Sequence, residues 1–180
     1  MVEEAAGRAV VLTQDDYYYD RSGLNLDEIA RLNLDHPDAV DLALLLEHLK
    51  SLRSGQPVNK PTYCRKTHRR TLGALVTPRP ILIVEGLFLF THAGLVGEFN
   101  LKVFLELDEK KILERRLRRD TNEFSREPHD VTSRFHGSIW PGYKQHIEPT
   151  KSAADTVVTE EFNAMRLAQI LLRQSKQPLR

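Results

Sequence analysis

The stretch PILIVEGLFLF, residues 80–90, decides the fold class. Residues 81–84 are β-branched or Leu without polar alternation, which predicts a strand buried on both faces in the middle of a parallel sheet. Glu85 follows where the strand ends, and Gly86 lets the backbone turn. Because ligands of open α/β sheets bind beyond the carboxyl ends of the strands, Glu85 is a candidate site residue. An ordinary polar strand end explains Glu85 equally well.

Strand-like and helix-like segments alternate along the rest of the chain. Leucines at three- and four-residue spacing follow residues 35–38 and form one apolar helix face, which Gly55 ends. This alternation predicts an α/β, doubly wound fold with a mostly parallel sheet. The further predicted strands are residues 8–13, 100–107 and 155–159, and the predicted helices are residues 35–54, the segment after Asp108 with Ile112, Leu113 and Leu117, and residues 162–174.

Carboxylates stand at two further points where a site could form. Asp15 and Asp16 follow the first predicted strand, where one could accept a proton from a hydroxyl and one could hold a metal. Local turns made by Asp side chains are the alternative. Asp35 stands two residues before Pro37, a pattern that favours a helix N-cap.

Two basic segments have open interpretations. Residues 56–80 contain Tyr63, His68 and several Arg and Lys, and predict either a β-hairpin that covers a site or a plain surface loop. Four arginines within residues 115–119 suit phosphate binding, but a solvent-facing helix surface is at least as consistent with them. Residues 121–149 predict a lid or a packing loop.

Composition sets the broad class. The 180 residues correspond to about one domain, and the net charge of +1 argues against a general nucleic-acid or membrane-surface binder. One cysteine excludes an internal disulfide and fits a reducing cytoplasm. The N-terminal residues lack the basic-then-apolar order of a signal peptide, and no apolar run is long enough to span a membrane.

Taken together, the motifs resemble the uridine/cytidine kinase and nicotinamide riboside kinase branch of the P-loop small-molecule kinases. The order and spacing of the motifs match that branch across nearly all of the chain. Residues 135–143, FHGSIWPGY, look more like the nicotinamide riboside kinases. The matching motifs are TQDDYY at 13–18, NLDHPDAVD at 33–41, PTYCRKTH at 61–68, ILIVEG at 81–86, ERRLRRD at 114–120 and PTKSAAD at 149–155.

The resemblance implies a single kinase domain, residues 1–180, with a substrate hairpin at about 56–79 and a lid at about 115–149. Its implied reaction transfers the γ-phosphoryl group of ATP, with Mg²⁺, to the 5′-hydroxyl of a ribonucleoside: uridine, cytidine or nicotinamide riboside. It implies no nucleic-acid or membrane partner and leaves a homo-oligomer open. The implied roles are Asp15 as catalytic base, Asp15 and Glu85 at the metal, Asp35 at the ribose hydroxyls, Tyr18, Tyr63, His68 and Arg126 at the substrate, and Arg116 and Arg119 as catalytic arginines of the lid.

The chain also departs from that family. No GxxxxGK[ST] phosphate loop occurs in the 180 residues, and the match starts at the family's second strand. We therefore expect a missing N-terminal segment, a partner that supplies the central strand, or a rearranged fold. Arg65 stands where uridine kinases have Phe, so uridine specificity is left open. The alternatives are a non-catalytic nucleoside-binding or regulatory module and a related kinase acting on pantothenate or a sugar phosphate.

Overall fold

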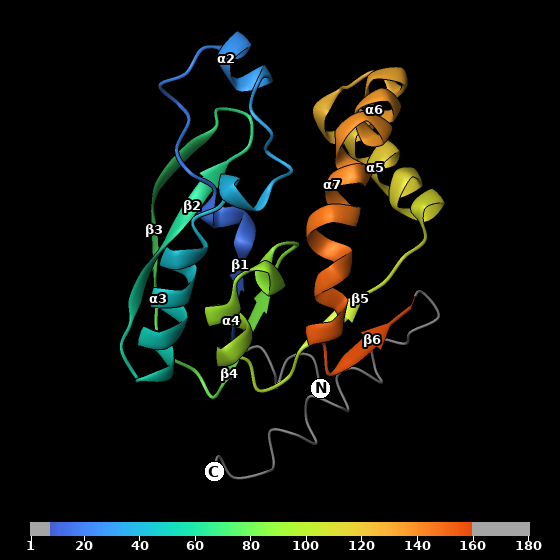
Figure 1. Ribbon diagram of the computed structural model, residues 1–180. Coiled ribbons are helices and arrows are strands. Elements are labelled where there is room, and N and C mark those ends of the chain that lie inside the picture. The colour runs from blue at the N-terminus through green and yellow to red at the C-terminus, as the bar shows by residue number, and fades with distance from the viewer. Residues whose placement is uncertain (1–7, 160–180) are drawn as a thin grey trace. The chain divides into compact units, whose positions relative to one another are not determined.

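The computed structural model describes residues 8–159 of the chain. The predicted helix at 162–174 lies outside the described residues. The chain divides into two compact units, residues 1–99 and residues 100–180. In both units short strands alternate with helices (Figure 1), as the sequence predicts.

Two parallel strands form the centre of the first unit. β1 (Ala9–Thr13) pairs with β4 (Ile81–Glu85) in a register that sets Thr13 beside Glu85. Both strands therefore end at the same edge, which confirms the predicted parallel pairing. The predicted burial on both faces is wrong: the paired residues Val11 and Ile83 are 51% and 38% exposed. The reason is that β1 is the only strand beside β4 among the described residues.

A β-hairpin occupies the basic segment that follows the first long helix. β2 (Val58–Cys64) pairs antiparallel with β3 (Arg69–Val76), which confirms the hairpin over a plain loop. His68 in the connecting turn has a positive φ of 52°. Such a backbone is uncommon for a residue with a Cβ, so the turn holds His68 in a defined position.

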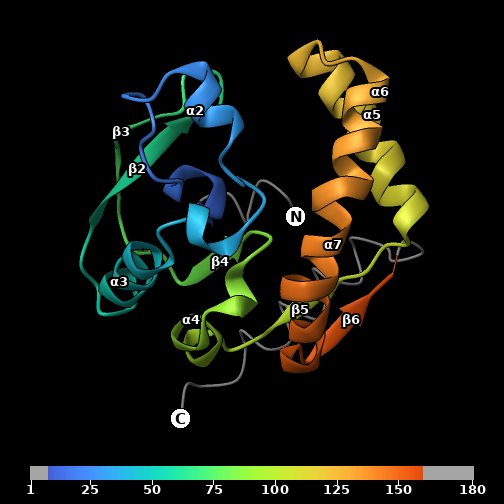
Figure 2. The same ribbon diagram turned by 45° about the horizontal axis from the view of Figure 1, so that its top comes forward.

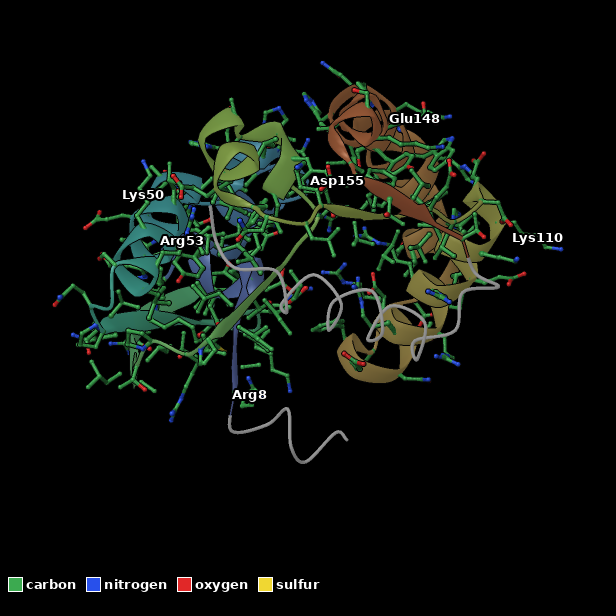
Figure 3. All side chains as sticks on the ribbon, turned by 90° about the horizontal axis from the view of Figure 1, so that it is seen from below. Arg8, Lys50, Arg53, Lys110, Glu148 and Asp155 are labelled. Carbon is green, nitrogen blue, oxygen red and sulfur yellow. The ribbon has the colours of Figure 1, made fainter. Side chains whose placement is uncertain are left out.

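The helices of the first unit lie between and beside these strands. α3 (Leu42–Arg53) packs against the hairpin, as the two views of the ribbon agree (Figure 1, Figure 2). Arg53 and Lys50, which lie near the end of α3 (Figure 3), both pair with Glu98, Lys50 at 3.8 Å. The remaining elements are the turns Gln14–Tyr17, Pro37–Ala39 and Leu89–Thr91 and the helices α2 (Leu26–Ala30) and α4 (Ala93–Glu98).

The start of α3 corrects the prediction for Asp35. The N-cap is Asp41, whose carboxylate accepts a hydrogen bond from the amide of Leu44 at 3.1 Å. Residues 37–39 form only a single 3₁₀ turn, and Val40 then forms an antiparallel bridge with Tyr18. Because that bridge keeps the backbone extended, the helix cannot begin at Asp35.

The second unit consists of one parallel strand pair and a long helical region. β5 (Val103–Leu105) pairs with β6 (Thr156–Val158), and both are shorter than predicted. The N-cap of α5 (Glu109–Phe124) is Asp108, whose carboxylate accepts a hydrogen bond from the amide of Lys111 at 2.9 Å, which confirms the predicted cap. No helix among residues 8–159 is both long enough and apolar enough to cross a membrane.

Residues 128–153 are helical, so the packing loop is wrong as an alternative for residues 121–149, and the lid stays a prediction. Phe135, Trp140 and Tyr143 stack in sequence, with ring centroids 6.0 and 4.9 Å apart. The stacked rings stabilise this run of helical segments. The spacing of small and aromatic residues in the sequence did not predict a helix here. The segments are α6 (Pro128–Arg134), a π-helix (Phe135–Ile139), α7 (Trp140–Gly142), a second π-helix (Tyr143–Ile147) and a 3₁₀ helix (Glu148–Ala153).

Candidate active site

The turn at the end of β1 carries one exposed carboxylate, Asp15, between side chains that are buried. Gln14 and Tyr17 are 1% and 0% exposed, whereas half of the Asp15 side chain is exposed. The Oε1 atom of Gln14 accepts a hydrogen bond from the amide of Phe88 at 2.6 Å. The Tyr17 hydroxyl shares a hydrogen bond of 3.0 Å with Nδ1 of His48 in α3. The turn is therefore fixed to the loop after β4 and to α3, with Asp15 facing outward.

Asp16 fixes the same turn to the hairpin. Its carboxylate forms an ion pair with Lys60 of β2, and both side chains are mostly buried. It also accepts a hydrogen bond from the backbone amide of Tyr63 at 3.4 Å. Asp16 thus fixes the hairpin to the turn that follows β1.

Asp15 lies beside a basic residue of the hairpin turn. Its carboxylate pairs with Nη2 of Arg65, and both side chains remain partly exposed. Because Thr13 pairs with Glu85, the last residue of β4, Glu85 and Asp15 both stand at the carboxyl end of this strand pair. Mg²⁺ binds carboxylate oxygens together with phosphate oxygens, so the donor chemistry of these two residues suits that ion.

Two stacked tyrosines lie next to Asp15. The rings of Tyr18 and Tyr63 stack with centroids 5.2 Å apart, and the Tyr18 hydroxyl donates to the carbonyl of Leu34 at 3.1 Å. Burial raises the pKa of Tyr18 to about 12, and the nearby carboxylates of Asp15 and Asp35 add to this rise. The three predicted residues Asp15, Tyr18 and Asp35 therefore gather at one place in the first unit.

His68 completes the aromatic group from the hairpin turn. Its Nδ1 atom shares a hydrogen bond of 3.0 Å with the Tyr63 hydroxyl. Its carbonyl accepts a hydrogen bond from the amide of Arg21 at 2.8 Å. The turn therefore fixes the orientation of the Tyr63 ring, and this cluster can offer an aromatic face and two carboxylates to a polar ligand that contains a ring.

Two of the three predicted lid arginines, Arg119 and Arg126, pair with a buried acid in the second unit. Asp120 is 3% exposed and pairs with Nη2 of Arg119 at 2.7 Å and with Nη1 of Arg126 at 3.6 Å. The left-handed backbone of Ser125 ends α5 and turns Arg126 back toward Asp120. Guanidinium groups held in this way suit phosphate oxygens. Arg116 lies half-buried on the same helix.

Sequence reasoning missed Gln14 in the first unit and Asp120 in the second, and it assigned Asp16 to proton transfer or metal binding instead of to the hairpin contact. Gln14 and Asp120 are buried polar groups with defined partners, and Asp16 anchors the hairpin. Buried polar side chains need such partners, but a polar residue in a loop or beside arginines gives no sequence signal that it is buried.

Sequence comparison identifies the family. The model of the phosphoribulokinase/uridine kinase family matches residues 9–164. The uridine kinase of Klebsiella pneumoniae subsp. pneumoniae is 38% identical over 149 residues, which are 82% of this chain and 70% of that protein. The uridine kinase of Erwinia tasmaniensis shows the same identity and coverage.

Solved structures show the same fold. Phosphoribulokinase from Rhodobacter spheroides superposes with a TM-score of 0.62 at 16% identity, over 87% of this chain and 62% of that one. A structure described as a possible uridine kinase from Bacillus stearothermophilus superposes with a TM-score of 0.54 at 16% identity, over 87% of this chain and 74% of that one. The fold and the sequence match together define an α/β protein of the uridine kinase-like P-loop kinase class. The chain belongs to the phosphoribulokinase/uridine kinase family.

Proposed function

We propose that this chain is a nucleoside kinase that transfers the γ-phosphoryl group of ATP to the 5′-hydroxyl of a ribonucleoside. The observation that carries the proposal is the cluster of Asp15, Tyr18, Asp35 and Tyr63 in one unit. A ribonucleoside needs an acceptor for its 5′-hydroxyl proton, acceptors for its ribose hydroxyls and an aromatic face for its ring. The cluster contains all three kinds of group.

In the proposed reaction Asp15 accepts the proton of the 5′-hydroxyl. The oxygen of that hydroxyl forms a bond to the γ-phosphorus, the bond from that phosphorus to the bridging oxygen breaks, and ADP leaves. Asp35 accepts hydrogen bonds from the ribose hydroxyls. Arg116, Arg119 and Arg126 neutralise phosphate charge, with Asp120 holding the last two.

Magnesium, when bound, would neutralise the phosphate oxygens, and Asp15 and Glu85 are the residues that would hold it. Asp15 would then serve both the metal and the hydroxyl proton. The substrates are free small molecules, which agrees with the near-neutral charge of the chain. As a kinase of small nucleosides, the protein would work in the cytoplasm.

A second candidate is a module that binds a nucleoside without phosphorylating it. The ion pair between Asp15 and Arg65 favours this candidate, because it engages the carboxylate that would accept the proton. The two candidates share the nucleoside site and differ only in whether the bound nucleoside is phosphorylated.

Phosphoryl transfer separates these candidates. The chain would be incubated with magnesium-ATP and, separately, uridine, cytidine and nicotinamide riboside, with Asp15→Asn as the matched variant. A 5′-monophosphate formed by the parent and reduced at least about 100-fold in Asp15→Asn supports the kinase. Nucleoside binding without product supports the binding module. A folded chain that neither binds nor phosphorylates a nucleoside contradicts both.

A further inference from the structure

The turn after β1 carries two neighbouring carboxylates that pair with two different positions of the hairpin. Asp16 pairs with Lys60 within β2, and these side chains are 16% and 19% exposed. Asp15 pairs with Arg65, which directly follows β2 in the hairpin turn, and these side chains are 49% and 42% exposed. The contact between the turn and the hairpin therefore contains an inner ion pair that is shielded from water and an outer ion pair that water reaches.

The two ion pairs differ in how readily they separate. Water solvates the separated charges of an exposed pair and salt screens their attraction, so such a pair contributes little free energy. Separating a mostly buried pair leaves charges that water reaches poorly, which costs much more. The pair of Asp15 and Arg65 can therefore open while Asp16 remains bound to Lys60 and to the amide of Tyr63. Opening requires rotation about the side-chain bonds of Arg65 and leaves the hairpin in place.

The closed pair occupies the carboxylate that the proposed reaction uses. Nη2 of Arg65 donates to Oδ2 of Asp15. Under the proposed function, the 5′-hydroxyl of the nucleoside donates to this carboxylate before its proton is transferred. A hydroxyl and a guanidinium that donate to the same oxygen compete for it, so the hydroxyl binds there only in molecules in which the pair is open. The apparent affinity for the nucleoside is then reduced in proportion to the open fraction.

We propose that the ion pair of Asp15 and Arg65 is an autoinhibitory contact, closed in the free protein and opened by the ribonucleoside. The neighbouring pair of Asp16 and Lys60 is the fixed support of this contact and does not open with it. This inference rests on the proposed function, because it takes the 5′-hydroxyl to lie at Asp15. It adds to that function a step in which substrate binding exposes the proton acceptor.

Nucleoside binding in a double-mutant cycle tests this contact. Titration calorimetry with uridine, cytidine and nicotinamide riboside would give dissociation constants for the parent, Arg65→Gln, Asp15→Asn and the double variant, at about 50 mM and about 500 mM NaCl. Lys66→Gln is the matched control, because it removes an exposed positive charge from the next position of the same turn. Circular dichroism reports whether each variant is folded. The measurement needs neither ATP nor turnover.

We expect Arg65→Gln to bind the nucleoside about two- to fivefold more tightly than the parent at the lower salt concentration. The same substitution should change the affinity less than about 1.5-fold in the Asp15→Asn background, and so should Lys66→Gln in the parent. Higher salt should tighten binding to the parent about twofold, because it weakens the closed pair, and should leave Arg65→Gln nearly unchanged.

A folded Arg65→Gln that binds the nucleoside no more tightly than the parent overturns the inference and leaves the proposed function standing. An equal gain in the Asp15→Asn background also overturns it, because the effect of Arg65 would then not pass through Asp15. If neither the folded parent nor folded Arg65→Gln binds any of the three nucleosides, the proposed function itself is wrong, and the inference falls with it.

Discussion

The side chain of Gln14 fills the space where a side chain at position 86 would have to stand. A Cβ atom added to Gly86 would lie 2.6 Å from Oε1 and 2.8 Å from Cδ of Gln14 and would also collide with its Cβ. The same Oε1 accepts the amide of Phe88, so the loop after β4 closes directly over the turn that carries Asp15. This contact fixes the two acidic strand ends against each other.

Gly86→Ala should therefore destabilise the fold by about 1–3 kcal/mol, because the buried Gln14 cannot move away without losing its hydrogen bond. Urea unfolding measures the change. The matched control is Gly97→Ala in α4, where nothing lies within 4 Å of an added Cβ. That control should be neutral or stabilising by about 0.5–1 kcal/mol. Equal effects of the two substitutions would show that Gln14 does not constrain position 86.

The ion pair between Asp16 and Lys60 should hold the hairpin more strongly than a surface pair could. A double-mutant cycle with Asp16→Asn and Lys60→Met should give a coupling energy of about 1–3 kcal/mol, because both side chains are mostly buried. The control cycle uses Lys144→Met and Glu148→Gln, an exposed pair at 2.5 Å, for which we expect less than about 0.5 kcal/mol. If the coupling energy between Asp16 and Lys60 is no larger than that between Lys144 and Glu148, Asp16 does not anchor the hairpin.

His48 should make the fold less stable at acid pH. Burial lowers the pKa of His48, although the carboxylates of Glu47 and Asp41 act in the other direction. Below about pH 6.5 the unfolded chain therefore binds a proton that the folded chain resists, and stability falls from there until the pH reaches the lowered pKa. His48→Gln removes this contribution, so its stability should decline less than that of the parent between pH 7 and pH 5. Parallel stability curves for the two proteins would contradict this linkage.

The sequence predicted those elements whose signal is local. The apolar run at 81–84 predicted a strand with a parallel neighbour, which β1 provides. Asp108 was recognisable as a helix cap because an amphipathic segment follows it. The cluster of Asp15, Tyr18 and Asp35 was accessible only through family resemblance, since these side chains meet through contacts between separate segments.

The remaining features depend on long-range contacts. Asp35 and Asp41 are both Asp residues before a leucine-rich helix, and the bridge between Tyr18 and Val40 decides which one caps it. The burial of Gln14 depends on the loop after β4, more than 70 residues away in the sequence. Pattern and spacing within one segment contain no information about such partners.

Recognition of the ribose by Asp35 is the central claim, and a cycle of ligand and protein variants tests it most directly. Titration calorimetry would give dissociation constants of uridine and 2′-deoxyuridine for the parent and for Asp35→Ala, and this measurement needs neither ATP nor turnover. We predict that the parent prefers uridine by at least about tenfold, since a hydroxyl to a charged acceptor contributes roughly 1.5–3 kcal/mol, and that Asp35→Ala reduces this preference to about twofold or less. A tenfold preference that persists in folded Asp35→Ala would place the ribose elsewhere and contradict the account.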